Sequence, residues 1–459
     1  MFFNQDASTM EEITLFGQTV RYRAWRNIPY VENPVVPEYQ QLSLFAPEPL
    51  FAGERVNGYT LSTAPVFVPN TVGGYMPGAL DEPKEDRRRP GQANAVFQAL
   101  RHGYVVAVPA VRGRSQAGGQ APACIVDYKA AVRWLHYFAA DLPGDESRII
   151  TSGTSAGGAL SALMGATGDH PDYVPYLREI GAAEASDAIF AASCYCPVTN
   201  LDHADMAYEW EFAGVYDYHR RHMCKDEGGR PSFEAVDGEL DGLQRKTSQE
   251  LAAAFPAYVN GLALKDESSA PLVLDAQGCG SFRTHIEKII LDSARRAMGQ
   301  GVDVSGKTWL MLENDQPAAM DFSAYVRDIT RMKAAPAFDD LAMASPENNL
   351  FGTPELPYRH FTAYSAAHSL QDGSIAPGQL VRMLNPMDYL ADPAAVKAPY
   401  WRIRHGGCDR DTSLAISAIL TLKLREYGYS VDYHSPWDTP HSGDYDLDEL
   451  FAWIDGICR

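Results

Sequence analysis

Residues 147–158 read Ser-Arg-Ile-Ile-Thr-Ser-Gly-Thr-Ser-Ala-Gly-Gly, and the run Ala-Leu-Ser-Ala-Leu-Met follows them. The β-branched residues before the Gly-x-Ser-x-Gly pattern favour a strand, and the run after it favours a helix. A serine between such a strand and helix lies on a sharp turn. The turn needs small neighbours, because the backbone there approaches adjacent elements closely. The stretch therefore predicts that Ser155 is a nucleophile at the end of a sheet; the alternative is an ordinary turn serine.

Apolar runs that resemble strands alternate with helix-like segments up to residue 199 and again from residue 396 onward. The other expected strands are residues 13–16, 20–25, 64–69, 104–111, 188–197, 400–405 and 431–434. The clearest expected helices are residues 93–102, 125–138, 412–426 and 447–457. This alternation indicates an α/β fold, a mostly parallel sheet with helices on both faces.

The alternation stops between residues 200 and 395, where helical segments such as 251–264 and 282–298 dominate. We therefore predict three parts. Residues 1–199 and 396–459 form the core, and residues 200–395 form an inserted, mainly helical lid. We expect the lid to lie over the C-terminal edge of the sheet, where open α/β sheets bind ligands.

Charge and composition limit the possible partners. Of 459 residues, 46% are hydrophobic, as in ordinary globular proteins, and the net charge is −20. So acidic a surface repels phosphate backbones, so we expect no nucleic-acid partner. No apolar run has the length of a membrane span, and residues 1–19 lack the pattern of a signal peptide. We expect a cytoplasmic protein without a membrane partner, or a secreted one if a leader was removed.

The seven cysteines are scattered along the chain. Their odd number favours free buried thiols over a disulfide framework, and none of their spacings resembles a zinc site. We expect neither a metal nor a cofactor. The cysteines are Cys124, Cys194, Cys196, Cys224, Cys279, Cys408 and Cys458.

A serine nucleophile needs a base that a third group orients, in the chain order serine, acid, histidine. Asp409 follows the strand 400–405 and is the predicted acid; the alternative is a solvated turn carboxylate. His441 lies in a turn-rich loop before the last helix and is the predicted base. His405 ends a strand and could be a packed residue, and His434 lies within a strand and fits a structural role better.

The developing oxyanion requires two N–H donors. One is expected from Ala156, directly after the nucleophile. The other is expected from the loop 71–74 that follows the strand 64–69, where Val72 and Gly73 are the candidates. The alternative for Gly73-Gly74 is a flexible turn.

Four segments together resemble bacterial tannases of the subtype B group, and the resemblance runs from about Gly58 onward. They are Gly-Thr-Ser-Ala-Gly-Gly at 153–158, Pro-Asn-Thr-Val-Gly-Gly-Tyr-Met-Pro-Gly at 69–78, Arg-His-Gly-Gly-Cys-Asp-Arg-Asp-Thr-Ser at 404–413, and Pro-Trp-Asp-Thr-Pro-His-Ser-Gly-Asp-Tyr-Asp at 436–446. The resemblance implies an α/β-hydrolase fold with a large lid. It also implies hydrolysis of galloyl esters, small phenolic substrates, to gallic acid and an alcohol.

The resemblance also assigns residues. It places the triad on Ser155, Asp409 and His441 and the galloyl-binding groups on Lys333, Glu347 and Asp411. Phenolic hydroxyls can donate to carboxylates and accept from an ammonium group, so these side chains suit the ring. Without the resemblance, Lys333 and Glu347 would be lid surface charges, and Asp411 would cap the helix after it.

Other functions use the same residues. A broader aryl carboxylesterase or a feruloyl esterase would share the triad. A binding protein of the same fold without catalysis is the alternative of a different class, and the intact triad argues against it. In the fungal tannase and feruloyl esterase group, cysteines adjoin the nucleophile and the base, whereas Thr154 and Ser442 stand there in this chain.

Overall fold

A nine-stranded sheet forms the centre of the structure, a computed structural model that describes residues 3–225 and 231–459. The strand order is β1-β2-β3-β5-β4-β6-β7-β12-β13. Pairing is antiparallel from β1 to β5 and parallel from β5 to β13. The bounds are β1 Thr9–Leu15, β2 Gln18–Pro29, β3 Gln41–Pro47, β4 Pro65–Pro69, β5 Val105–Pro109, β6 Asp145–Thr154, β7 Ala191–Tyr195, β12 Tyr400–Arg404 and β13 Ser430–His434.

The predicted α/β fold is confirmed, and each strand expected from the sequence belongs to this sheet. The sequence analysis missed β3. This strand is buried from Leu42 to Pro47, so it lacks the alternation of apolar and polar residues that marks a half-buried strand. It becomes recognisable only through its neighbours β2 and β5.

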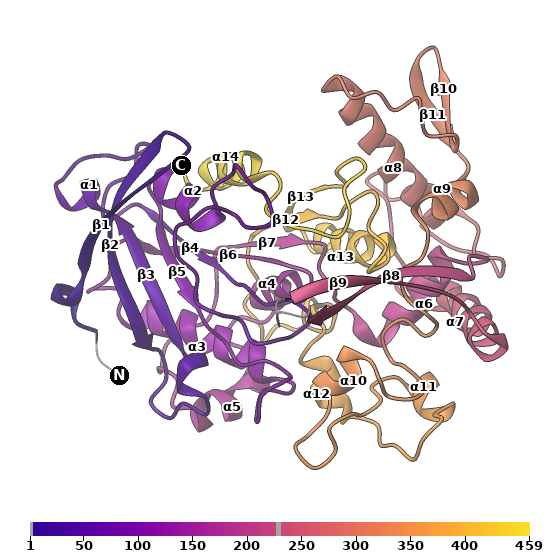
Figure 1. Cartoon of the computed structure of the whole chain (residues 1–459), viewed down its shortest axis with the longest axis horizontal. Helices are drawn as coiled ribbons and strands as arrows, with labels where there is room; N and C mark the ends of the chain where they lie inside the picture. Colours follow the sequence, from indigo (N-terminus) through magenta and orange to yellow (C-terminus); the bar gives the residue numbers. More distant parts are fainter. Residues whose placement is uncertain (1–2, 226–230) are drawn as a thin grey trace.

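The helices of the core form two groups. Contacts join α3 to α4, which packs on β6 and β7, and join α2 to α14. In the view of Figure 1, α2 and α14 lie above the sheet and α3 lies below it. The bounds are α1 Glu48–Phe51, α2 Ala95–Arg101, α3 Ala123–Tyr137, α4 Ala156–Ala166, α5 Val174–Glu179, α13 Leu414–Glu426 and α14 Leu447–Cys458.

Residues 200–395 contribute no strand to the nine-stranded sheet within the described ranges. Their helices are α6 Leu201–Glu211, α7 Gly242–Gly261, α8 Ser281–Gly299, α9 Phe322–Ile329, α10 Pro346–Leu350, α11 Ala363–Ala367 and α12 Gly378–Arg382. Two antiparallel hairpins were not predicted: β8 Asp217–Lys225 with β9 Pro231–Glu239, and β10 Leu310–Glu313 with β11 Gln316–Met320. In Figure 1 these elements lie to the right of the sheet, and the β8–β9 hairpin extends back toward it.

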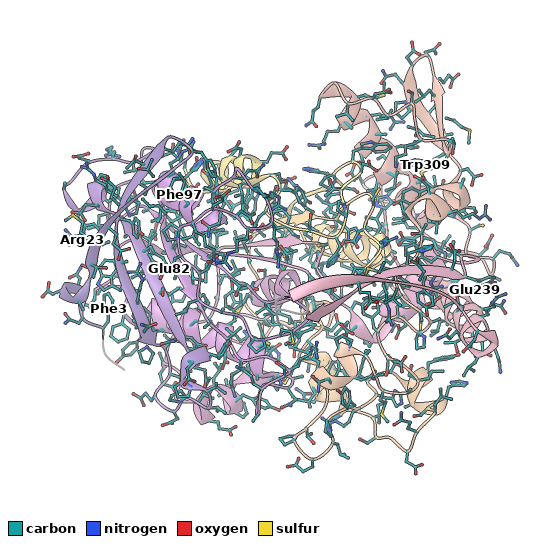
Figure 2. All side chains as sticks on the ribbon, in the orientation of Figure 1. Phe3, Arg23, Glu82, Phe97, Glu239 and Trp309 are labelled. Atoms are coloured by element: carbon teal, nitrogen blue, oxygen red, sulfur yellow. The ribbon has the colours of Figure 1, made fainter. Side chains whose placement is uncertain are left out.

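One hydrophobic cluster runs through both parts of the molecule. It includes Phe97 of α2, which is fully buried, and Trp309 before β10, which is 3% exposed. Figure 2 shows these two residues far apart, in the sheet region and in the inserted segment. The inserted segment is therefore packed onto the core through apolar side chains, which fixes the walls of any site between them.

The described cysteines are free thiols, as predicted. Those at 124, 194, 196 and 458 are buried, and those at 279 and 408 are partly exposed. The side chain of Cys224 lies outside the described residues. Among the helices of the described ranges, none combines the length and the apolar character that a bilayer crossing needs.

Candidate active site

Ser155 lies at the junction of β6 and α4 with φ 62° and ψ −123°, a conformation that L-residues rarely adopt. Small neighbours make the turn possible. A Cβ on Gly153 would lie 2.3 Å from Asn70 Nδ2, and a Cβ on Gly157 would lie 2.4 Å from Asn70 Oδ1. The amide of Ser155 donates to the carbonyl of Tyr195 at the end of β7, at 2.9 Å. The turn therefore packs between the loop after β4 and the end of β7. A larger residue at Gly153 or Gly157 would displace the turn.

Asp409 and His441 meet across the sheet edge, with His441 Nδ1 2.7 Å from Asp409 Oδ2. Asp409 is 2% exposed. Its burial raises its pKa, but His441 and His405 outweigh burial and bring the pKa down to about 2. Burial likewise lowers the pKa of His441, and the charge of Asp409 outweighs it, so the pKa of His441 lies well above its ordinary value. The pair is an oriented imidazole on an ionised carboxylate, as a general base requires.

The other two histidines of the final sheet segment have structural surroundings. His405 is fully buried, with Nδ1 2.8 Å from Ser417 Oγ and Nε2 3.6 Å from Asp409 Oδ2. His434 is partly buried and lines a different cavity. Of the three, His441 alone shares a cavity with Ser155 among the described residues.

This cavity, which we call the catalytic cavity, has a volume of about 460 Å³. His441 Nε2 lies 3.9 Å from Cys196 Sγ, and no hydrogen bond within the described ranges joins it to Ser155. Such bonds are often long without substrate and shorten in the complex. Core and inserted segment both contribute walls, which include Gly74, Tyr75, Ser155, Ala156, Lys333, Glu347, Asp411 and His441.

Lys333 and Asp411 form an ion pair in this cavity, with Nζ 2.8 Å from Oδ1. Lys333 Nζ also lies 3.8 Å from the ring centre of Phe338, a cation–π contact. Burial lowers the pKa of Lys333, but Asp411 and Glu347 outweigh it, so the pKa is raised. Asp411 does not cap α13, because Ser413 is the N-cap and accepts from the amide of Ala415.

Glu347 lines the same cavity and is 8% exposed. Among the described residues, its carboxylate has no hydrogen bond or ion pair to another residue. Burial raises the pKa of Glu347, and Lys333 opposes this only in part. Buried carboxylates are normally paired, because desolvation of the charge is costly. Apart from a bond with its own backbone amide, the Glu347 carboxylate therefore has hydrogen-bonding capacity that a ligand in the cavity can use.

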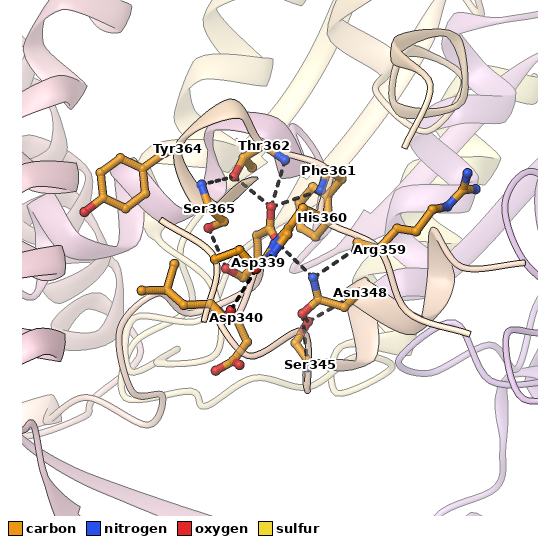
Figure 3. A network of polar contacts seen from close by, with 12 residues as sticks. Asp339, Asp340, Ser345, Asn348, Arg359, His360, Phe361, Thr362, Tyr364 and Ser365 are labelled. Carbon is orange, nitrogen blue, oxygen red and sulfur yellow. Dashed lines mark hydrogen bonds and ion pairs between the residues drawn. The ribbon is translucent and has the colours of Figure 1, made fainter. Parts of the chain in front are cut away.

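Asp339 organises the loop beside Glu347 (Figure 3). One carboxylate oxygen accepts from Asn348 Nδ2 and from His360 Nδ1, both at 2.7 Å. The other accepts from the amides of Phe361 and Thr362 and from the Thr362 hydroxyl. Asp339 is fully buried, so these bonds replace its lost hydration.

The short helix α10, which carries Glu347, is held by this network. Ser345 caps the helix, since Ser345 Oγ accepts from the amide of Asn348 and Asn348 Oδ1 accepts from the amide of Ser345. The side-chain amide of Asn348 then donates to Asp339. Asp205 on α6 accepts from the amide of Asp339 at 3.1 Å. Sequence reasoning missed Asp205 and Asp339, because nothing local marks their partners.

Of the predicted oxyanion groups, Ala156 directly follows Ser155. Ala156 is the first residue of α4, so its N–H is one of the unpaired donors of the helix start. The amide of Val72 donates to Asn70 Oδ1 at 3.2 Å. Gly74 and Tyr75, both at positive φ, line the catalytic cavity, whereas Val72 and Gly73 are not part of its wall. These contacts favour a donor at Gly74 or Tyr75 over the two predicted candidates, Val72 and Gly73.

Asn70 is a further residue that the sequence analysis did not single out. Its Nδ2 donates to the carbonyls of Ser152 and Gly157, at 3.1 and 3.0 Å. Its Oδ1 accepts from the amide of Val72. Asn70 thus ties the loop after β4 to both sides of the Ser155 turn. Its position directly after the predicted strand 64–69 was the available signal.

Two groups of side chains in the described ranges are close enough to share a metal ion: Cys196 with Asp409 and His441, and His434 with Asp446 and Glu449. In the first group, the carboxylate and the imidazole already bind each other. In the second, Arg402 Nη2 lies 2.5 Å and Arg404 Nε 3.5 Å from Asp446 Oδ2. These cations neutralise Asp446, so the donor set suits a divalent cation poorly.

Comparisons with known proteins identify relatives of the whole chain and of its parts. The BD-FAE family model matches residues 73–205. The crystal structure of tannase from Lactobacillus plantarum is 46% identical, covering 100% of this chain and 99% of that one, with a TM-score of 0.96. The Fusobacterium nucleatum tannase structure is 44% identical over 100% and 99% of the two chains, with a TM-score of 0.94. A structure described as tannin acyl hydrolase in complex with ethyl gallate is 45% identical over 100% and 98%, with a TM-score of 0.94.

More distant matches are esterases. Carboxylesterase NlhH of Mycobacterium tuberculosis is 31% identical over 156 residues, 33% of this chain and 46% of that protein. Esterase LipQ of the same organism is 36% identical over 136 residues, 27% of this chain and 31% of that protein. The chain thus spans less than half the length of these curated relatives.

Proposed function

Since this chain belongs to the bacterial tannases and is a carboxylic ester hydrolase, we propose that it cleaves galloyl esters to gallic acid and an alcohol. The substrates in this proposal are tannins, galloyl glucoses and alkyl gallates. The observation that carries it is the unpaired, buried Glu347 carboxylate, which lies in one cavity with Ser155, His441 and the Lys333–Asp411 pair. The related structure of a tannin acyl hydrolase in complex with ethyl gallate, at 45% identity, supports the same substrate class.

In the proposed mechanism, Ser155 attacks the ester carbon and His441 takes the serine proton at Nε2. Asp409 holds the imidazole through Nδ1 and stabilises its protonated form. The amide of Ala156 and the amide of Gly74 or Tyr75 donate to the oxyanion. His441 returns the proton to the leaving alcohol. In the second half of the reaction His441 takes a proton from a water molecule, which attacks the acyl carbon, and then gives that proton to Ser155 as the acid leaves.

The polar side chains of the cavity wall would bind the ring hydroxyls of the substrate. Hydroxyls of the galloyl ring would donate to Glu347 and Asp411, and one would accept from the ammonium of Lys333. A buried group that needs a hydroxyl partner discriminates strongly against an ester without it, whereas an apolar pocket discriminates weakly. The site therefore favours gallate esters over esters of unsubstituted benzoate.

The test is to incubate the protein with methyl gallate, methyl ferulate and methyl benzoate and to quantify each released acid by chromatography. We expect methyl gallate to have the highest kcat/KM by a wide margin. The competing candidate is a broader aryl carboxylesterase or feruloyl esterase, which the partial matches to the BD-FAE model and to NlhH favour. Comparable release of ferulate or benzoate would establish that candidate and reject the galloyl preference.

A further inference from the structure

A second, smaller cavity lies between α8, α13 and the end of β13. Its volume is about 170 Å³, and it shares no wall residue with the catalytic cavity. We call it the α8–α13 crevice. Its floor carries side-chain hydroxyls and its rim carries positive charges. Together these two features define the chemistry of an occupant.

Four hydroxyls of the crevice have no hydrogen-bond partner in the described structure: those of Ser293, Thr421, Tyr433 and Ser435. Ser293 is 5%, Thr421 2% and Ser435 1% exposed. Serine and threonine within a helix can bond back to a carbonyl of the preceding turn, which Ser293 on α8 and Thr421 on α13 do not do. These buried groups face the crevice and can both donate to and accept from a ligand.

The rim of the crevice is positively charged on a protein whose net charge is −20. Lys288 and Arg296 lie eight positions apart on α8, so they share a face of that helix. Neither forms an ion pair within the described ranges. The two acids of the crevice wall are already paired: Asp292 with Arg295, which lies outside the crevice, at 2.7 Å, and Glu267 with Arg425, which also lines it, at 3.2 Å. Two cations therefore remain available to an anion.

We propose that the α8–α13 crevice binds a small hydroxylated carboxylate. The carboxylate would lie between Lys288 and Arg296, and the hydroxyls would pair with Ser293, Thr421 and Ser435. Gallate has this chemistry, since it combines one carboxylate with three hydroxyls on a ring. The crevice has room for such an acid but not for a galloylated sugar. This inference does not depend on the proposed catalytic function.

The test measures gallate binding to the full chain by isothermal titration, in the wild type and in Lys288→Gln/Arg296→Gln. In the wild type we expect gallate to bind at two sites, the catalytic cavity and the α8–α13 crevice. The double variant should lose binding at the crevice, with affinity weakened on the order of tenfold or more for each lost charge-assisted bond. Arg327→Gln on α9 is the matched control, because this exposed arginine forms no ion pair within the described ranges and lies outside the crevice. The control should keep both binding events, and all variants should retain wild-type turnover of esters.

Ligand analogues separate the two halves of the proposal. Pyrogallol keeps the hydroxyls without the carboxylate, benzoate keeps the carboxylate alone, and inorganic phosphate probes charge alone. Each should bind the crevice at least tenfold more weakly than gallate. Thr421→Val should weaken gallate but not benzoate. Equal binding by phosphate or benzoate, or unchanged gallate binding in the double variant, would overturn the proposal. If instead the proposed galloyl esterase function is wrong, the gallate binding that is missing should be that in the catalytic cavity, which Glu347→Gln would otherwise weaken, and binding in the crevice should remain.

Discussion

Replacement of Glu347 by alanine is the sharpest test of the galloyl site, since no hydrogen bond or ion pair within the described ranges joins Glu347 to the Asp409–His441 pair. A hydrogen bond to a charged group contributes about 1.5–3 kcal/mol. Its loss should lower kcat/KM for methyl gallate by about 10- to 150-fold. Methyl benzoate has no hydroxyl for Glu347, so its kcat/KM should stay nearly constant. The wild-type preference, on the order of 10⁴-fold or more for such sites, should shrink by the same factor.

The assay compares both esters in the wild type, in Glu347→Ala and in Glu347→Gln, with Glu355→Ala as a control. Glu355 is an exposed acid a few residues further along, so its loss should change neither ester. Because no other residue of the described ranges forms a hydrogen bond or ion pair with the buried Glu347 carboxylate, its removal should leave the unfolding temperature unchanged or raise it. Equal losses on both esters would show that Glu347 acts through folding or the lid, and the protein would then be a general aryl esterase.

Three other predictions concern the triad and its support. Ser155→Ala should abolish ester cleavage with the fold intact by circular dichroism; a folded variant with normal turnover would exclude the triad. The pKa of His441 lies above its ordinary value, so kcat/KM should fall with decreasing pH through a midpoint above about 6.5. Asp409→Asn should move this midpoint to lower pH and reduce kcat by about 10⁴-fold. Asp339→Asn should raise KM for methyl gallate more than for methyl benzoate if it positions Glu347, whereas equal changes would indicate a purely structural role.

The sheet and the proximity of Ser155, Asp409 and His441 could be predicted because their signals are local. A β-branched run, small residues around Ser155 and a helical run lie within a single short stretch. Asp409 and His441 each follow a predicted strand, and the carboxyl ends of parallel strands meet at one edge of a sheet. Spacing along the chain was therefore sufficient to bring these three residues together.

The two hairpins of the inserted segment could not be predicted by the same means. β8 reads Asp-Tyr-His-Arg-Arg-His-Met-Cys-Lys, which is polar at most positions. β10 and β11 expose most of their residues. A strand without a buried face has no alternation of apolar and polar residues, so the pattern that identified the sheet strands is absent. The network around Asp339 was hidden for a related reason, since its partners come from separate segments of the chain.

The resemblance to a family supplied Lys333 and Glu347, and the structure gives a physical account of why these two positions differ from surface charges. Lys333 is balanced by Asp411 at 2.8 Å, so this pair costs little in the free protein. Glu347 has no such partner and is held in place by a capped helix that Asp339 anchors. The hydrogen bonds around Asp339 thus hold Glu347 in place despite the free-energy cost of burying its carboxylate. Selection for stability alone would remove that carboxylate, so its position in the cavity of Ser155 points to a ligand that completes it.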